Sequence, residues 1–162
     1  MKREILDPLF LTAVITGNMT IVQLCVEMCA EKPTENVTIA KLGGADKNGN
    51  AALHLAALCS NQEMIKFLIQ KGVDREPRGE FKRTPFQFAI EQNLKLEVCK
   101  LLYNDSRDLT TTDEQENAAL HLASLHNNNQ EIIEYLLAQG ADREARGRYQ
   151  RTPFQEAVLS LF

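Results

Sequence analysis

The sequence lacks the features that would place it in a membrane or on a nucleic acid. No run of apolar residues approaches the length of about eighteen that a membrane-spanning helix requires. Glu4 and Asp7 interrupt the stretch that could otherwise form the apolar core of a secretory signal. The formal net charge is −4, so bulk attraction to nucleic acid phosphates or to an anionic membrane is not indicated. We therefore expect no nucleic acid or membrane partner and a cytoplasmic or nuclear location, or the host cytosol for a secreted effector.

Cysteine is scarce, and the patterns of known catalytic and metal sites are missing. The four cysteines lie mostly in apolar helical stretches and are expected to be reduced: Cys25, Cys29, Cys59 and Cys99. Cys25 and Cys29 have no CxxC pair or histidine cluster beside them, which favours core packing over zinc binding. The segment LGGADKNGN, residues 42–50, matches no phosphate-binding pattern. No nucleophile recurs beside the histidines. We expect no enzymatic activity, catalytic residue, metal or cofactor.

Repetition is the main positive feature of the sequence. The stretch DREPRGEFKRTPFQFA at residues 74–89 returns as DREARGRYQRTPFQEA at residues 142–157. Likewise, NAALHLAAL at residues 50–58 returns as NAALHLASL at residues 117–125. The matching apolar residues of the four motifs recur at intervals of 33, 34 and 34 residues: Leu53, Phe86, Leu120 and Phe154. The chain therefore has a unit of about 33 residues, and a block of two units is duplicated.

Each unit predicts two helices. Thr84-Pro85 and Thr152-Pro153 are helix-start signals, because Thr can cap an unpaired amide and Pro needs no partner at the first helical position. The second helices read EMIKFLIQ, LEVCKLL and EIIEYLLA, with apolar residues at three- and four-residue spacing. Gly72 and Gly140 suit the left-handed residue that follows such helices. The first helices are expected at residues 52–59, 85–92, 119–126 and 153–161.

These motifs, together with the helix end QGAD and the period of about 33 residues, resemble the ankyrin repeat. The resemblance implies an all-α solenoid of stacked helix-turn-helix units with β-turn tips, forming a single domain over residues 1–162. It also implies that the rings of His54 and His121 bond to the backbone of a neighbouring turn. The expected units are residues 7–45, degenerate and with an insertion, then 46–77, 78–109, 110–145 and an incomplete 146–162.

The ankyrin resemblance implies that a partner is bound by a concave face, built from turn tips and exposed positions of the first helices. We expect a protein-interaction module or scaffold that binds a protein segment there. For the charged tip residues, solubility and salt bridges between neighbouring tips are an equally good interpretation. The candidate partner-binding residues are Phe81, Arg83, Glu91, Gln92, Asn117, Leu125, His126, Arg148, Tyr149 and Arg151.

Two alternatives stay open. The chain could instead be the targeting or regulatory portion of a larger enzyme, or of a secreted host-directed effector, whose catalytic domain lies outside these residues.

Phe81 and Tyr149 are aromatic residues at tips two units apart, and we expect them to contact a ligand. The other interpretation is that each ring lies flat against its own turn and pins the tip to the stack.

Two segments are expected to differ from the regular units. TPFQEAVLSLF at residues 152–162 supplies a first helix without a partner helix, so its apolar side chains cannot all be buried by one neighbouring repeat. We expect a longer natural chain or coverage of this edge by another molecule, with self-association as one form of it. The insertion within residues 30–44 is polar and contains glycines, and it is expected to be the least protected internal segment in hydrogen exchange.

Overall fold

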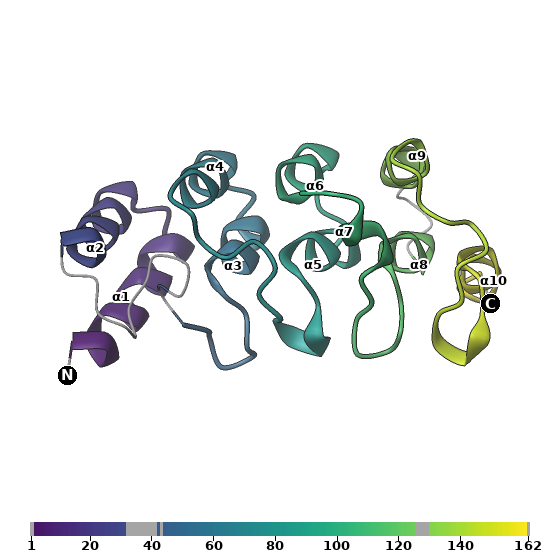
Figure 1. Cartoon of the computed structure of the whole chain (residues 1–162), viewed down its shortest axis with the longest axis horizontal. Coiled ribbons are helices and arrows are strands. Elements are labelled where there is room, and N and C mark those ends of the chain that lie inside the picture. The colour runs from purple at the N-terminus through teal and green to yellow at the C-terminus, as the bar shows by residue number, and fades with distance from the viewer. Residues whose placement is uncertain (1, 32–41, 43, 126–129, 162) are drawn as a thin grey trace. The chain divides into compact units, whose positions relative to one another are not determined.

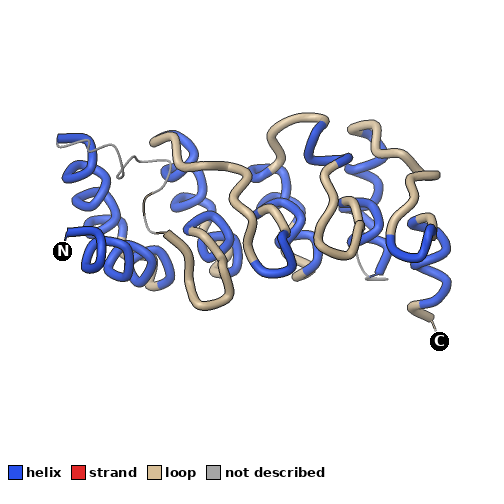
Figure 2. Tube along the Cα trace, turned by 60° about the horizontal axis from the view of Figure 1, so that its bottom comes forward, coloured by secondary structure: helices blue, strands red, loops and turns tan. Residues whose placement is uncertain are grey.

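The computed structural model describes residues 2–31, 42, 44–125 and 130–161. The chain divides into two compact units, Met1–Glu80 and Phe81–Phe162, each of which is described by itself. Within the described ranges, every regular element is a helix, and the helices are joined by short turns and loops (Figure 2). The predicted all-α class is confirmed.

Two pairs of helices form the first unit (Figure 1). Helix α1 (Lys2–Ile15) packs against α2 (Met19–Glu31) and α3 (Ala52–Leu58), and α3 packs against α4 (Gln62–Gln70). The apolar face of each helix points toward the neighbouring helices, and this packing buries the side chains that recur at three- and four-residue spacing. The largest fully buried apolar side chains of the unit are Phe10, Leu53, Met64, Ile65 and Leu68.

The second unit repeats this arrangement with three first helices. Helices α5, α8 and α10 lie side by side, with α8 packed against both neighbours, and α6 packs against α5 and α9 (Figure 1). A short helix, α7, lies in the loop between α6 and α8. The bounds are α5 (Pro85–Glu91), α6 (Leu96–Leu102), α7 (Arg107–Thr110), α8 (Ala119–Leu125), α9 (Gln130–Ala138) and α10 (Pro153–Leu159).

The predicted helices are confirmed to within two residues at each end. Gly72 and Gly140 follow α4 and α9 with φ of 80° and 95°, as expected of a left-handed residue after a helix. Helix α7 was not predicted, because its four residues are too few to show an apolar spacing. Leu109 is buried, and Asp108 Oδ2 accepts a hydrogen bond from the Asn104 backbone N at 2.6 Å. Glu80–Lys82 and Arg148–Gln150 each form a tight turn, in which Phe81 and Tyr149 have left-handed and therefore non-helical backbone angles.

Gln87 starts helix α5 and ties it to the following turn. Its Oε1 accepts a hydrogen bond from the Thr84 backbone N at 3.1 Å, and its own backbone N donates to Thr84 Oγ1 at 3.2 Å. This reciprocal pair is a capping box, which satisfies two amides at the start of the helix. The Nε2 of Gln87 donates to the backbone O of Thr111 at 2.6 Å, in the turn before α8. One side chain thus serves both the helix and the stacking of units.

His121 has the corresponding role at the start of α8. Its Nδ1 accepts a hydrogen bond from the Ala118 backbone N at 3.3 Å, and its Nε2 lies 3.2 Å from the backbone O of Arg151. The ring is fully buried. The predicted structural role, with the ring bonded to the backbone of a neighbouring turn, is therefore confirmed for His121.

Several predictions fall outside what the structure describes. Most of the insertion, residues 32–41 and 43, lies outside the described residues, so its low protection stays a prediction. The interhelix turn at residues 126–129 also lies outside them. The assignment of residues 1–162 to a single domain likewise stays a prediction.

Candidate interaction surface

Two turns of the chain present an aromatic side chain to solvent. The first aromatic tip has the sequence EFKR (residues 80–83), and the second aromatic tip has the sequence RYQR (residues 148–151). Phe81 is 46% exposed and Tyr149 is 67% exposed. Large aromatic side chains stabilise a fold most when they are buried. The exposure of Phe81 and Tyr149 at equivalent positions of two turns therefore needs an explanation.

Both aromatic residues occupy left-handed backbone. The φ angles are 54° and 56° for Phe81 and Lys82, and 56° and 58° for Tyr149 and Gln150. Such pairs of positive φ occur in type I′ turns, which are dominated by Gly, Asn and Asp. A larger L-residue there costs roughly 1 kcal/mol or more. Backbone preference therefore does not account for an aromatic residue at either tip.

Buried side chains of the preceding turn hold each tip in place. At the second tip, Asn117 Oδ1 accepts a hydrogen bond from the Arg148 backbone N at 3.3 Å. A Cβ added to Gly147 would lie 2.7 Å from His121 Nε2 and 2.9 Å from Asn117 Oδ1, so only glycine fits beside these side chains. The first tip repeats this arrangement, with the glycine, asparagine, histidine and bonded amide supplied by Gly79, Asn50, His54 and Glu80.

Each aromatic ring also lies against arginine. The Arg83 Cζ is 4.9 Å from the centre of the Phe81 ring, and Arg148 and Arg151 place their Cζ atoms 4.7 and 5.0 Å from the centre of the Tyr149 ring. These distances are typical of cation–π contacts. Arg148 also donates a hydrogen bond to the Tyr149 hydroxyl at 2.9 Å. The rings thus contact their own turns and still leave much of their surface in solvent.

Arg83 fixes the first tip to the body of the second unit. Its Nε lies 3.2 Å from Asp113 Oδ2, and a terminal nitrogen lies 3.3 Å from Glu91 Oε1 on α5. The Asp113 carboxylate is fully buried. In addition, the Glu114 backbone N donates to the Phe81 backbone O at 2.8 Å. The first tip is therefore held by a buried ion pair and by a main-chain bond to the next turn.

The predicted partner-binding residues all belong to the second unit, but they differ in burial. Phe81, Gln92, Arg148 and Tyr149 are exposed, and Glu91, Leu125 and Arg151 are half-buried. Arg83 and Asn117 are buried, which corrects their expected place at the surface: they hold the tips through the bonds described above. His126 lies outside the described residues. Binding of a partner by any of these residues stays a prediction.

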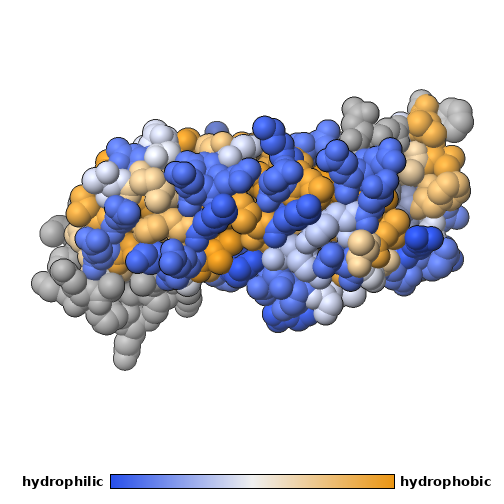
Figure 3. Space-filling view, turned by 90° about the horizontal axis from the view of Figure 1, so that it is seen from above, coloured by the Kyte–Doolittle hydropathy of each residue, from blue (hydrophilic) through white to orange (hydrophobic). Residues whose placement is uncertain are grey.

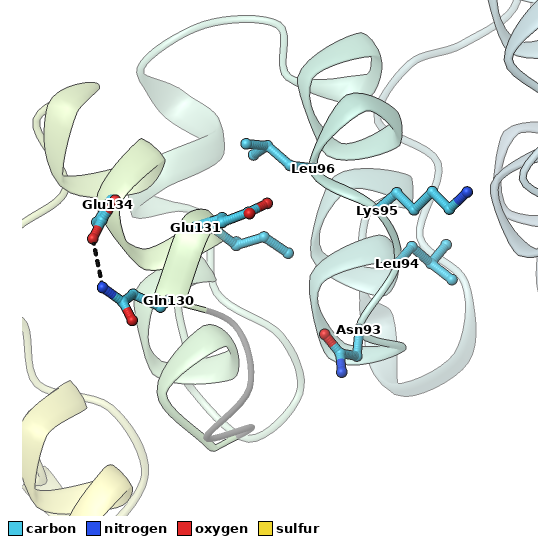
Figure 4. Close-up of a pocket in the computed structure, with 8 residues that line it drawn as sticks. Asn93, Leu94, Lys95, Leu96, Gln130, Glu131 and Glu134 are labelled. Atoms are coloured by element: carbon cyan, nitrogen blue, oxygen red, sulfur yellow. Dashed lines mark hydrogen bonds between the residues drawn. The ribbon is translucent and has the colours of Figure 1, made fainter.

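A groove of about 560 Å³ between α6 and α9 was not anticipated from the sequence. In Figure 4 the Glu131 side chain lies toward Leu96, and Lys95 points away from α9. On the α9 side of the groove, Gln130 donates a hydrogen bond to Glu134 at 2.9 Å. The groove joins segments more than thirty residues apart, so no local pattern announces it. Its lining residues are Asn93, Leu94, Lys95, Leu96, Gln130, Glu131, Ile132 and Glu134.

The cysteines are free thiols, of which Cys59 is exposed. Burial raises the pKa of the Cys99 thiol to about 12 and also raises the pKa values of Cys25 and Cys29. In the part of the chain that the structure describes, no group of three or more His, Cys, Asp or Glu residues could hold a metal ion. Among the described helices, none has the length and apolar character needed to cross a bilayer.

A family model described as ankyrin repeats in three copies matches residues 3–78 and 72–147. The chain belongs to the ankyrin repeat family. Ankyrin repeats are in general protein-interaction modules. The match covers nearly all of the first unit and the second unit as far as residue 147, and the helix pairs within each unit agree with it. The predicted family is confirmed.

Several known proteins are similar to this chain. The transient receptor potential cation channel subfamily A member 1 homolog of Caenorhabditis elegans is 33% identical over 127 residues, which is 78% of the chain. The human channel of that subfamily is 30% identical over 131 residues, or 80% of the chain. An ankyrin repeat protein of Monkeypox virus is 28% identical over 152 residues, or 88% of the chain. The chain spans 10%, 12% and 25% of the length of these relatives.

The ankyrin units of this chain do not all have the same turn. Among the described residues, the turns at 46–50 and 113–117 each contain a single residue with positive φ, Gly49 and Glu116. The two aromatic tips each contain two such residues. The aromatic tips are therefore a distinct turn type that occurs in alternate ankyrin units.

Proposed function

We propose that this ankyrin chain is a protein-interaction module whose second unit binds a protein partner through Phe81 and Tyr149. One observation carries the proposal: a bulky aromatic residue is held exposed at positive φ, against the preference of the backbone, at two equivalent turns. Membership of the ankyrin family supports a protein partner in general. Aromatic and arginine side chains are also the types that most often anchor interfaces.

The other predicted residues have different roles in this proposal. Arg83 and Asn117 are buried and position the tips through their hydrogen bonds. Arg148 and Arg151 lie against the Tyr149 ring and offer hydrogen-bond donors to carboxylates of the partner. Glu91, Gln92 and Leu125, at the ends of the first helices, would border the bound segment on the concave face, and His126, which lies outside the described residues, is proposed as a contact from the sequence alone. No catalytic role is proposed, and a cytoplasmic or nuclear location is proposed.

Substitution by asparagine tests the proposal, because asparagine tolerates positive φ and lacks the aromatic ring. In Phe81→Asn and Tyr149→Asn, the relieved backbone conformation offsets the lost cation–π contact, which is worth about 0.5 to 1 kcal/mol at exposed sites. We expect stability to stay within about 1 kcal/mol of the parent chain. Binding of a partner captured with the parent chain should weaken by roughly 30-fold for each change, which corresponds to about 2 kcal/mol.

Gln150→Asn is the matched control. Gln150 has the same backbone conformation, beside Tyr149, and carries no ring. It should leave partner affinity close to the parent value and raise stability by up to about 1 kcal/mol, because the backbone conformation is relieved without the loss of a ring contact. If instead Phe81→Asn and Tyr149→Asn melt several degrees lower and bind the captured partner normally, the rings serve only to pin the turns, and the proposed surface is wrong.

A second candidate function is that of a binding or regulatory portion of a longer protein. The observation that favours it is the small share of the relatives' length, 10% to 25%, that the chain spans. Under this candidate the same tips would bind a segment of the longer protein or of its target. The mass of the endogenous protein on an immunoblot distinguishes it: a species near 18.3 kDa excludes it.

A further inference from the structure

Helix α10 has an apolar face that α8 does not cover. Phe154 is 74% exposed, whereas Phe86, the equivalent residue of α5, is 1% exposed. Figure 3 shows apolar atoms gathered at the end of the second unit that carries α10. The exposed apolar residues there are Phe154, Val158, Leu159 and Leu161. Patches of this kind mark interaction sites in soluble proteins.

The duplicated block shows what covers the equivalent face of α5. The Phe86 ring lies 5.5 Å, between ring centres, from the ring of Tyr103, which directly follows α6. Gln87 donates its side-chain amide to the Thr111 backbone O, and Ile90 is fully buried. Gln155 has the sequence position of Gln87, yet it is exposed. The covering layer of α5 thus supplies an aromatic ring and a backbone carbonyl, and α10 has neither among the described residues.

The ion pairs of the two equivalent arginines, Arg83 and Arg151, differ in the same way. Arg83 has the buried Asp113 carboxylate at 3.2 Å, from the turn that precedes α8. Arg151 is the equivalent of Arg83, and its side chain is 39% exposed. Among the described residues, the carboxylate within ion-pair distance of Arg151 is that of Glu156, at 3.7 Å and on α10, the helix that follows Arg151. The guanidinium of Arg151 therefore has room for a carboxylate from a covering unit.

We propose that the exposed face of α10 is a docking surface for one further ankyrin-type unit. That unit places an aromatic or large apolar side chain on Phe154, a backbone carbonyl at the amide of Gln155, and a carboxylate at Arg151. A second copy of this chain does not supply the set, because the matching groups are already engaged: Asp113 with Arg83, and Tyr103 with Phe86 and Tyr135. The proposal shares Arg151 with the second aromatic tip, where its guanidinium lies 5.0 Å from the centre of the Tyr149 ring, but it does not depend on partner binding by Phe81 or Tyr149.

The test adds such a unit to the full chain. A copy of residues 95–138 is joined after Phe162, so that each appended residue stands 68 positions after its original, as Phe154 stands after Phe86. We expect the backbone amides of α10 to exchange with solvent at least about 100-fold more slowly in the extended chain. The amides of α4, in the first unit, should exchange at the same rate in both chains.

Two substitutions separate docking from a general effect of added length. Phe154→Ala should reverse most of the gained protection in the extended chain and change exchange rates less than about twofold in the 162-residue chain, where the ring is exposed. Replacing the appended counterpart of Asp113 by Asn should reverse part of the protection that the α10 amides gain in the extended chain. Unchanged α10 exchange in the extended chain overturns the proposal. So does a dimer of the 162-residue chain, seen by light scattering and abolished by Phe154→Ser, since the occupant is then a second copy.

Discussion

Arg83 and Arg151 occupy equivalent positions, yet their replacement by methionine should affect stability very differently. Arg83→Met leaves the Asp113 carboxylate buried without its cation, and removing one partner of a buried ion pair costs about 3 to 5 kcal/mol. Asp113 keeps hydrogen bonds from the backbone N atoms of Gln115 and Asn117, at 2.8 and 2.9 Å. Because these bonds still stabilise the charge, we expect the lower end, about 3 kcal/mol.

The matched substitution, Arg151→Met, should cost less than about 1 kcal/mol. Arg151 is partly exposed, and its ion pair with Glu156 is long at 3.7 Å, so solvent screens the interaction. Urea unfolding followed by circular dichroism measures both free energies, and the change in midpoint at constant slope gives the difference. Asp113→Asn in the Arg83→Met background should recover part of the loss, because it removes the unpaired charge. Equal losses for the two arginines, or a loss below about 1 kcal/mol for Arg83→Met, would refute the importance of the buried pair.

Two further predictions concern the thiols and the glycines beside the tips. At pH 8 in the native state, a maleimide should label Cys59 rapidly and Cys99 only after unfolding, because Cys99 is buried and its pKa of about 12 keeps the thiol protonated. Peptide mass spectrometry identifies the labelled cysteine. Rapid labelling of Cys99 in the native state would contradict its burial. Gly147→Ala should destabilise the chain by more than about 2 kcal/mol, since a Cβ would lie 2.7 Å from the buried His121 ring, whereas Arg146→Ala beside it should change thermal stability little.

Local signals made the helices predictable. The Thr-Pro pairs mark where α5 and α10 begin, because the capping interaction involves residues only three apart. The apolar spacing of the second helices likewise depends only on neighbouring residues. Repetition then placed all units in phase, since equivalent residues recur at a fixed interval.

The tips were less predictable because their geometry depends on distant residues. Nothing in the letters EFKR or RYQR indicates positive φ, since aromatic residues rarely adopt it. The burial of Arg83 follows from Asp113, thirty residues later, and the burial of Asn117 follows from the tip at Arg148. The sequence therefore located the turns correctly but did not separate the side chains that hold them from those that face solvent.

The two bonds made by the Gln87 side chain have a consequence for how the second unit unfolds. One end of the amide completes the first turn of α5, and the other binds the turn before α8. Fraying of α5 therefore releases a carbonyl in the neighbouring repeat, and separation of the repeats releases a side chain that helix α5 needs. Neither repeat can open without weakening the other, so these two repeats should melt in one cooperative transition and not one after the other.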